Sequence, residues 1–188
     1  MRPLKISREE LLLRCARTFK RYGYNGTTMD MLSAACGLTK ASFYHHYPNK
    51  EALLRDVLES MHDGMKNTLF AAAYNSNSSP IERISVLGRR AKKLFQDDTI
   101  GCLMGVVAMD ASYSNASFME PIRAFMDEWA QAYAHILTGP FEADRAESVG
   151  KQLVADYEGA ILLARIYQDP SLIDGVTARA VELLSNAI

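Results

Sequence analysis

The segment Thr39–His46, with the sequence TKASFYHH, could place DNA-reading side chains on one face of a short helix. Phe43 and Tyr47 lie four residues apart and are predicted to face inward. A cation, small residues that allow close approach, a phenol and an imidazole suit a helix in the major groove of DNA. These outward side chains are Lys40, Ala41, Ser42, Tyr44 and His45.

A second short helix and a tight turn precede this segment. The Thr28 hydroxyl can cap the first helix, and Gly37 tolerates the left-handed conformation that often ends a helix. Thr39 can cap the second helix, and a third begins after Pro48. The pattern is typical of a helix-turn-helix DNA reader, although any small helical protein could contain such a corner.

The charge of the chain is divided unevenly between its two parts. Residues 1–55 hold ten Lys or Arg against four Asp or Glu, a net charge of +6, and the remainder carries −7. A positive field neutralises phosphates, whereas an acidic surface repels DNA. The charge pattern therefore favours DNA binding by the N-terminal part.

Residues 5–60 resemble the DNA-binding domain of the TetR family of transcriptional regulators, most clearly in YGYNGTTMDMLSAACGLTKASFYHHYPNKEALL, residues 22–54. Ala41 stands where many members have glycine, and Tyr47 where phenylalanine is usual. The stretch GCLMGVVAMDAS, residues 101–112, also resembles a branch with electrophile- and small-molecule-responsive members. By family position, the resemblance implies base contacts from Lys40, Ala41, Ser42 and His45, and phosphate contacts from Thr28, Tyr44, His46 and Lys50.

The whole chain is predicted to be all-α, with about nine helices. Residues 1–48 are expected to form a three-helix helix-turn-helix domain, opened by a capping-box pattern at Ser7 and Glu10. Residues 49–188 are expected to form a helical bundle for ligand binding and dimerisation. The fourth helix, from 49 to about 74, would connect the two. Later helices are predicted at about 80–96, 99–112, 118–137 and 142–167 and at the C-terminus.

The last two helices are candidates for a dimer interface. A helix-turn-helix monomer reads a single half-site, so tight binding normally requires a two-fold partner. The resemblance implies dimerisation through these helices as a four-helix bundle, whereas periodicity alone favours an intrachain core. The expected interface residues are Val149, Leu153, Ala160, Ala164 and Tyr167 on one helix and Val176, Ala180 and Leu183 on the other.

The resemblance also implies a pocket for a small-molecule effector. Adaptable methionines and aromatic rings in the C-terminal part supply apolar surface for such a pocket, although plain core packing is the favoured reading for any one of these residues taken singly. The predicted lining residues are Met61, Met65, Phe95, Met104, Phe125, Trp129 and Tyr133.

Three cysteines form no CxxC pair and indicate neither a zinc site nor a disulfide framework. Cys102 is predicted to lie two residues into a helix that begins near Ile100, where the helix dipole would favour a reactive thiolate. Cys102 is thus a possible redox sensor, with a buried, inert thiol as the alternative. Cys15 and Cys36 fall on core faces and are expected to be structural.

The sequence gives little support to an enzyme. Glu59 and His62 match the Glu-x-x-His spacing of di-iron bundles, but such a site needs two of these motifs and two further glutamates. No phosphate-binding glycine loop or nucleophile elbow is present in the sequence. We therefore expect no catalytic residues, metal or cofactor, and a metal-binding helical enzyme is a remote alternative.

No apolar stretch reaches the ~20 residues that span a bilayer, and the N-terminus lacks the apolar run of a signal peptide. We therefore expect a cytoplasmic protein without membrane contacts. The predicted function is a ligand-responsive repressor that binds a palindromic operator as a homodimer and is released by a small-molecule effector. A ligand-gated activator of the same architecture is the alternative.

Overall fold

The computed structural model of the protein describes residues 6–111 and 116–187. Within these ranges all regular elements are helical, which confirms the predicted all-α class. None of the helices described is both long enough and apolar enough to cross a membrane. The elements are α1 Arg8–Tyr22, α2 Met29–Ala35, α3 Lys40–His46, α4 Lys50–Thr68, η1 Phe70–Tyr74, α5 Pro80–Gln96, α6 Leu103–Ala111, η2 Ala116–Phe118, α7 Met119–Leu137, α8 Ala143–Tyr167 and α9 Ser171–Ser185.

Side-chain caps set the starts of the first three helices, as predicted. The hydroxyls of Ser7, Thr28 and Thr39 accept hydrogen bonds from backbone N–H groups three residues later, at 3.1–3.2 Å. Gly23 ends α1 with φ 71°, and Gly37 has φ 67° in the turn between α2 and α3. Local sequence alone therefore fixes the boundaries of α1, α2 and α3.

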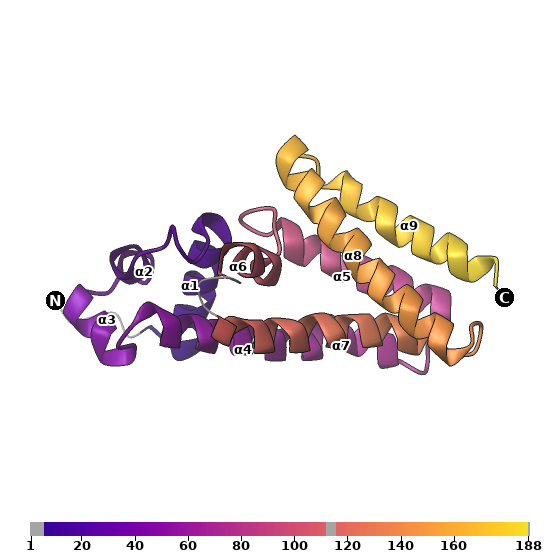
Figure 1. Ribbon diagram of the computed structural model, residues 1–188, viewed down its shortest axis with the longest axis horizontal. Helices are drawn as coiled ribbons and strands as arrows, with labels where there is room; N and C mark the ends of the chain where they lie inside the picture. The colour runs from indigo at the N-terminus through magenta and orange to yellow at the C-terminus, as the bar shows by residue number, and fades with distance from the viewer. Residues whose placement is uncertain (1–5, 112–115, 188) are drawn as a thin grey trace. The chain divides into compact units, whose positions relative to one another are not determined.

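The described residues form two compact units, and each is built from two separate stretches of sequence. The first unit comprises Met1–Gly64 and Leu103–Ile122, and the second comprises Met65–Cys102 and Arg123–Ile188. Within the first unit, α6 packs against α1 (Figure 1). The sequence predicted a boundary between residues 48 and 49. The units are divided differently, because α6 and the greater part of α4 belong with the helix-turn-helix.

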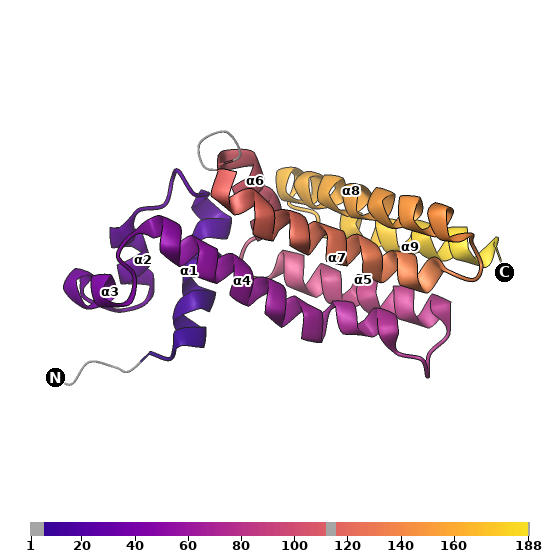
Figure 2. The same ribbon diagram turned by 60° about the horizontal axis from the view of Figure 1, so that its bottom comes forward.

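In the second unit, α9 packs against both α5 and α8 (Figure 2). The α5–α9 contact is close at Gly88, where an added Cβ would lie 2.2 Å from Thr177 Oγ1. Likewise, a Cβ on Gly150 of α8 would lie 2.4 Å from the Ala130 carbonyl oxygen of α7. Glycine at these two positions allows the helices to approach at backbone distance.

Two predicted boundaries differ from the structure. The fourth helix ends at Thr68 rather than near Tyr74, where Arg90 Nη1 donates to the Thr68 carbonyl at 2.5 Å and a 3-10 helix follows. The sixth helix begins at Leu103, because residues 97–101 form a loop in which Asp98 has φ 56°. Both differences arise from backbone geometry or contacts that helix propensity does not encode.

Candidate nucleic-acid interface and effector cleft

The outward face of α3 is formed as the sequence predicted. Phe43 is fully buried and Tyr47 is 8% exposed, so both anchor α3 to the first unit. The opposite face contains the side chains expected to meet DNA: Lys40, Ala41, Tyr44, His45 and His46 are exposed, and Ser42 is half-buried. Without support from a rigid scaffold, seven residues of helix would be marginal in water.

Two of the residues predicted to meet DNA, Lys40 on α3 and Thr28 before α2, already have partners in the protein. Lys40 Nζ pairs with Asp30 Oδ1 of α2 at 2.7 Å, and the hydrogen bond to Asp30 raises the pKa of Lys40. The Thr28 hydroxyl accepts from Met31 N at 3.2 Å, which leaves its own proton available for a phosphate oxygen. Thr28 is exposed and stands at the N-terminus of α2, where the helix dipole favours an anion.

Asp56 of α4 holds the C-terminal end of α3. Its Oδ2 accepts from the Tyr47 hydroxyl at 2.8 Å and from Arg8 Nη2 at 2.7 Å, so α1, α4 and the residue after α3 meet at one carboxylate. Burial and this hydrogen bond raise the pKa of Tyr47 to about 12, so its hydroxyl remains a donor at neutral pH. The Tyr47 hydroxyl is the group that makes this contact possible.

Lys50, which the sequence assigned to a phosphate, has a different role in the structure. Its ammonium donates to the carbonyl oxygens of Tyr24 at 2.6 Å and Thr27 at 2.8 Å, and lies 4.2 Å from the Tyr24 ring centroid. Burial lowers the pKa of Lys50, as expected for a partly desolvated cation. These contacts favour a scaffold role, in which Lys50 ties α4 to the loop before α2, and its phosphate contact stays a prediction.

The same loop is held from a second direction by Asp110 of α6. Asp110 Oδ2 accepts from Asn25 N at 2.6 Å, and Asn25 Nδ2 donates to Asp110 Oδ1 and to the Asp110 carbonyl, both at 2.9 Å. The two residues are 85 positions apart, so no local sequence pattern could reveal the pairing. Asp110 was not among the predicted site residues.

The predicted setting of Cys102 is not found. Cys102 precedes the first residue of α6, is 4% exposed, and hydrogen-bonds to the Glu158 side chain. A positive environment favours a reactive thiolate, and a neighbouring carboxyl provides the opposite charge. The structure therefore favours the inert alternative for Cys102.

The residues predicted to line the effector pocket are mostly packed core. Phe95 and Phe125 lie with ring centroids 5.3 and 5.9 Å from that of Trp129. Trp129 Nε1 and the Tyr133 hydroxyl are buried, and neither has a hydrogen-bond partner among the residues that the structure describes. Burial raises the pKa of Tyr133. Of the full set, Met65, Phe95, Met104, Phe125, Trp129 and Tyr133 are buried and Met61 is half-buried.

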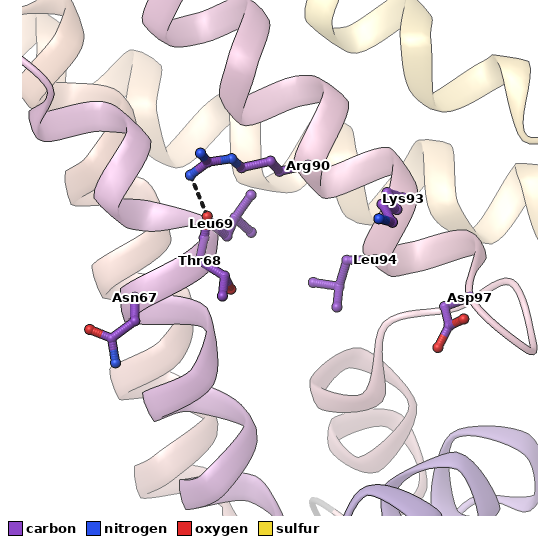
Figure 3. Close-up of a pocket in the computed structure, with 7 residues that line it drawn as sticks. All are labelled: Asn67, Thr68, Leu69, Arg90, Lys93, Leu94 and Asp97. Carbon is purple, nitrogen blue, oxygen red and sulfur yellow. Dashed lines mark hydrogen bonds between the residues drawn. The ribbon is translucent and has the colours of Figure 1, made fainter. Parts of the chain in front are cut away.

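A cleft of about 650 Å³ lies elsewhere in the second unit (Figure 3). Leu69 and Leu94 give it an apolar lining, while the Arg90 side chain reaches across from α5 to the Thr68 carbonyl. Its volume falls in the range of small-molecule sites. None of the seven predicted pocket residues lines it; the lining residues are Asn67, Thr68, Leu69, Arg90, Lys93, Leu94 and Asp97.

The structure also revises the predicted dimer interface. Five predicted residues are at most 9% exposed within a single chain, so they form intrachain core: Leu153, Ala160, Ala164, Val176 and Ala180. Val149 and Leu183 are half-buried, and Tyr167 is 69% exposed. Apolar residues lie on two faces of α8, and which face meets a second copy stays a prediction. Its outward apolar residues are Leu162, Leu163, Ile166 and Tyr167, followed by Leu172 on α9.

Comparisons with known proteins agree with this architecture. A profile of bacterial regulatory proteins of the TetR family matches residues 7–57, and one of the LmrA/YxaF-like transcriptional regulator C-terminal domain matches residues 80–179. The repressor DhaR of Mycobacterium sp. (strain GP1) is 26% identical over 174 residues, which cover 89% of this chain and 86% of DhaR.

Solved structures show the same fold. A TetR transcriptional regulator from Legionella pneumophila superposes with a TM-score of 0.85 and 26% identity, covering 96% of this chain and 99% of its own. A cysteine mutant of the TetR-family regulator CifR, solved with 26-bp double-strand operator DNA, has a TM-score of 0.71 and 18% identity over 96% of this chain and 98% of its own. With the second profile covering more than half of its length, this chain belongs to the TetR family of transcriptional regulators and carries an N-terminal helix-turn-helix DNA-binding domain.

Proposed function

We propose that the protein is a repressor that binds a palindromic operator as a homodimer and is released by a small-molecule effector. The observation that carries the DNA-binding part is the exposed polar face of α3 on a scaffold that buries its other face. In this proposal α3 presents Ser42 and His45 to base edges, while Tyr44 of α3 and Thr28 at the start of α2 contact the DNA backbone.

Selection from random double-stranded DNA tests this reading. The wild-type protein should select a palindrome whose half-sites are ~34 Å, or a multiple of that distance, apart. His45→Ala should lose about 1–3 kcal/mol of discrimination at symmetry-related positions, because one base-edge contact is removed from each half-site. His135→Ala, an exposed histidine of α7, is the matched control and should keep the wild-type preference. Unchanged selectivity in His45→Ala would remove α3 from base reading.

Dimerisation is proposed through the outward apolar face of α8. Leu162 is 58% exposed, Ile166 62% and Tyr167 69%, and such a contiguous patch on a soluble domain marks an interaction surface. Gly159 lies on the same face, and a Cβ added there would meet nothing within 4 Å of the same chain. A second copy of α8 can therefore approach closely at this point, which gives the two-fold assembly that a palindrome requires.

For the effector, we propose an anionic molecule with an apolar tail that binds the cleft between α5 and the end of α4. Arg90 and Lys93 outnumber the single carboxylate of Asp97, and a guanidinium matches a carboxylate group with two parallel hydrogen bonds. Leu69 and Leu94 suit an apolar tail.

This location also suggests how binding reaches the DNA-reading domain. Arg90 satisfies the Thr68 carbonyl at the C-terminus of α4, and an anion that engages Arg90 competes with that contact. Helix α4 runs from Lys50 to Thr68, and Lys50 holds the loop before α2. An effector that binds better when the end of α4 is displaced would shift the population away from the DNA-competent state.

Titration with octanoate, followed by the fluorescence of Trp129, tests both parts. Octanoate should bind more tightly than octanol, and operator should weaken its binding by the same factor, about 5- to 150-fold, as octanoate weakens operator binding. Lys93→Gln should lower octanoate affinity, whereas Lys92→Gln, the adjacent lysine that pairs with Asp174, should not. Equal octanoate affinity in wild type and Lys93→Gln would exclude this cleft.

A further inference from the structure

Two of the three cysteines lie against each other inside the DNA-binding domain. Cys15 is on α1 and Cys36 directly follows α2, and their sulfur atoms are 3.6 Å apart. Cys36 Sγ also donates to the Leu11 carbonyl at 3.8 Å, so Cys36 meets two groups of α1, this carbonyl and the Cys15 thiol. Spacing in the sequence gave no sign of this pair, because 21 positions separate the two residues.

We propose that Cys15 and Cys36 are a redox-sensitive pair that closes to an intrachain disulfide under a peroxide and thereby weakens operator binding. A disulfide needs an S–S distance of ~2.05 Å, so the two sulfurs must approach by about 1.5 Å from their present contact. This displacement is small enough to occur without unfolding the domain.

The surroundings make Cys36 the first sulfur to react. Cys36 is 4% exposed and lies between two exposed residues, Ala35 and Gly37, whereas Cys15 is completely buried. The Arg14 guanidinium lies beside it, with Nη1 3.4 Å from the Ala35 carbonyl oxygen, while Glu10 binds Arg14 from the other side. The hydrogen bond with Cys15 and the Arg14 charge lower the pKa of Cys36, against burial and Glu10. The same hydrogen bond and burial raise the pKa of Cys15.

The reaction balances with hydrogen peroxide as the two-electron oxidant. The Cys36 thiolate attacks one peroxide oxygen, the O–O bond breaks, and a sulfenic acid and hydroxide result. The Cys15 thiol then attacks the Cys36 sulfur, the S–O bond breaks, and water leaves with the proton of the thiol. The hydroxide takes up the proton that Cys36 lost on ionisation, so two thiols have become one disulfide and the peroxide has been reduced to two waters.

Closure acts on DNA binding because Cys36 adjoins the turn of the helix-turn-helix. Gly37 has φ 67° and Leu38 N donates to the Ser33 carbonyl at 3.0 Å, so this turn directly joins Cys36 to the start of α3. Pulling Cys36 toward α1 must therefore displace the turn, and with it the outward face of α3. We expect operator affinity to fall about 5- to 150-fold, the usual range for coupled sites.

Peptide mapping after treatment of the full chain with hydrogen peroxide tests the chemistry without DNA. The wild type and Cys102→Ala should both give a peptide linked through Cys15 and Cys36, and dithiothreitol should remove the link. A map in which peroxide leaves both thiols unmodified, or oxidises only Cys102, would overturn the proposal. Since the map needs no operator, its result is independent of the proposed repressor function.

Operator binding then tests the consequence. Peroxide should weaken binding by the wild type and by Cys102→Ala, and dithiothreitol should restore it in both. Cys15→Ala and Cys36→Ala, checked for native helicity, should bind operator after peroxide as they do before it. A linked wild-type protein that binds operator with unchanged affinity would show that the disulfide forms but does not regulate.

Discussion

At the scale of single residues, the Lys50 ammonium shows how a cation near a predicted DNA-binding surface can stabilise the scaffold. We predict that Lys50→Ala lowers the free energy of unfolding by about 1–3 kcal/mol, because hydrogen bonds from a charged group to two carbonyls are lost. The slope of log affinity against log salt should stay at the wild-type value, since no phosphate contact is removed. Thermal melting and a salt series of operator titrations measure the two quantities.

Lys40→Ala is the matched comparison. Its ion pair with Asp30 is exposed on both sides, so the melting temperature should change little, while loss of a cation beside DNA should flatten the salt slope by up to about one unit. If Lys50→Ala instead flattened the salt slope and left the melting temperature unchanged, Lys50 would be a phosphate contact, as the sequence predicted.

Among the elements, α6 anchors the loop that leads into α2. We predict that Asp110→Ala removes the two hydrogen bonds from Asn25 to the carboxylate and increases hydrogen exchange at Asn25 N, and that operator affinity falls because the start of α2 loosens. Asp127→Ala, an exposed carboxylate of α7, is the control. Wild-type exchange at Asn25 in the Asp110 variant would show that α6 does not hold the loop.

Most elements could be predicted from the sequence because their signals are local. Caps at Ser7, Thr28 and Thr39 and the glycines after α1 and α2 determine where these helices start and end. Pro80–Gln96 was predicted with its observed bounds; Ser79 and Glu82 form a complete capping box at its start, with bonds of 3.3 and 2.7 Å. The Ser79 backbone N–H donates a hydrogen bond to the Glu82 carboxylate, and this bond lowers the pKa of Glu82.

The predictions failed where tertiary contacts decide. Helix propensity continues through residues 69–74, but the Arg90 contact and the packing of Phe70 on Phe125, at 5.6 Å between ring centroids, accompany the end of α4 at Thr68. On α8, both Leu153 and Leu162 fit a helical apolar stripe, and periodicity could not tell the inner stripe from the outer one. The thiol pair and the Asp110 anchor depend on long-range proximity.

For the whole molecule, assembly depends on the outward apolar face of α8. We predict that Ile166→Asp yields a folded monomer that has lost tight binding to a full palindrome, because an unpaired charge in a dry interface costs several kcal/mol. Sedimentation equilibrium and operator titration measure the two effects. Gln131→Asp, at an exposed position of α7, should remain dimeric. A dimeric Ile166→Asp protein would place the interface elsewhere.

Leu153→Asp separates assembly from folding. Leu153 is 5% exposed within one chain, so a carboxylate there should unfold the second unit rather than produce a stable monomer. Circular dichroism distinguishes the two outcomes. A helical Leu153→Asp monomer would restore the interface expected from the sequence.

The loop around Asn25 is gripped by two helices at once, by Lys50 of α4 and by Asp110 of α6. If both helices move together, neither set of bonds is stretched and the loop travels with them. If one moves relative to the other, one set must lengthen. The loop is therefore strained only when α4 and α6 move relative to each other. A displacement that the two helices share leaves its hydrogen bonds unchanged. Thermal motions in which α4 and α6 move together would then leave α3 in place. A displacement of only one of the two helices would be transmitted through the loop to α2 and α3.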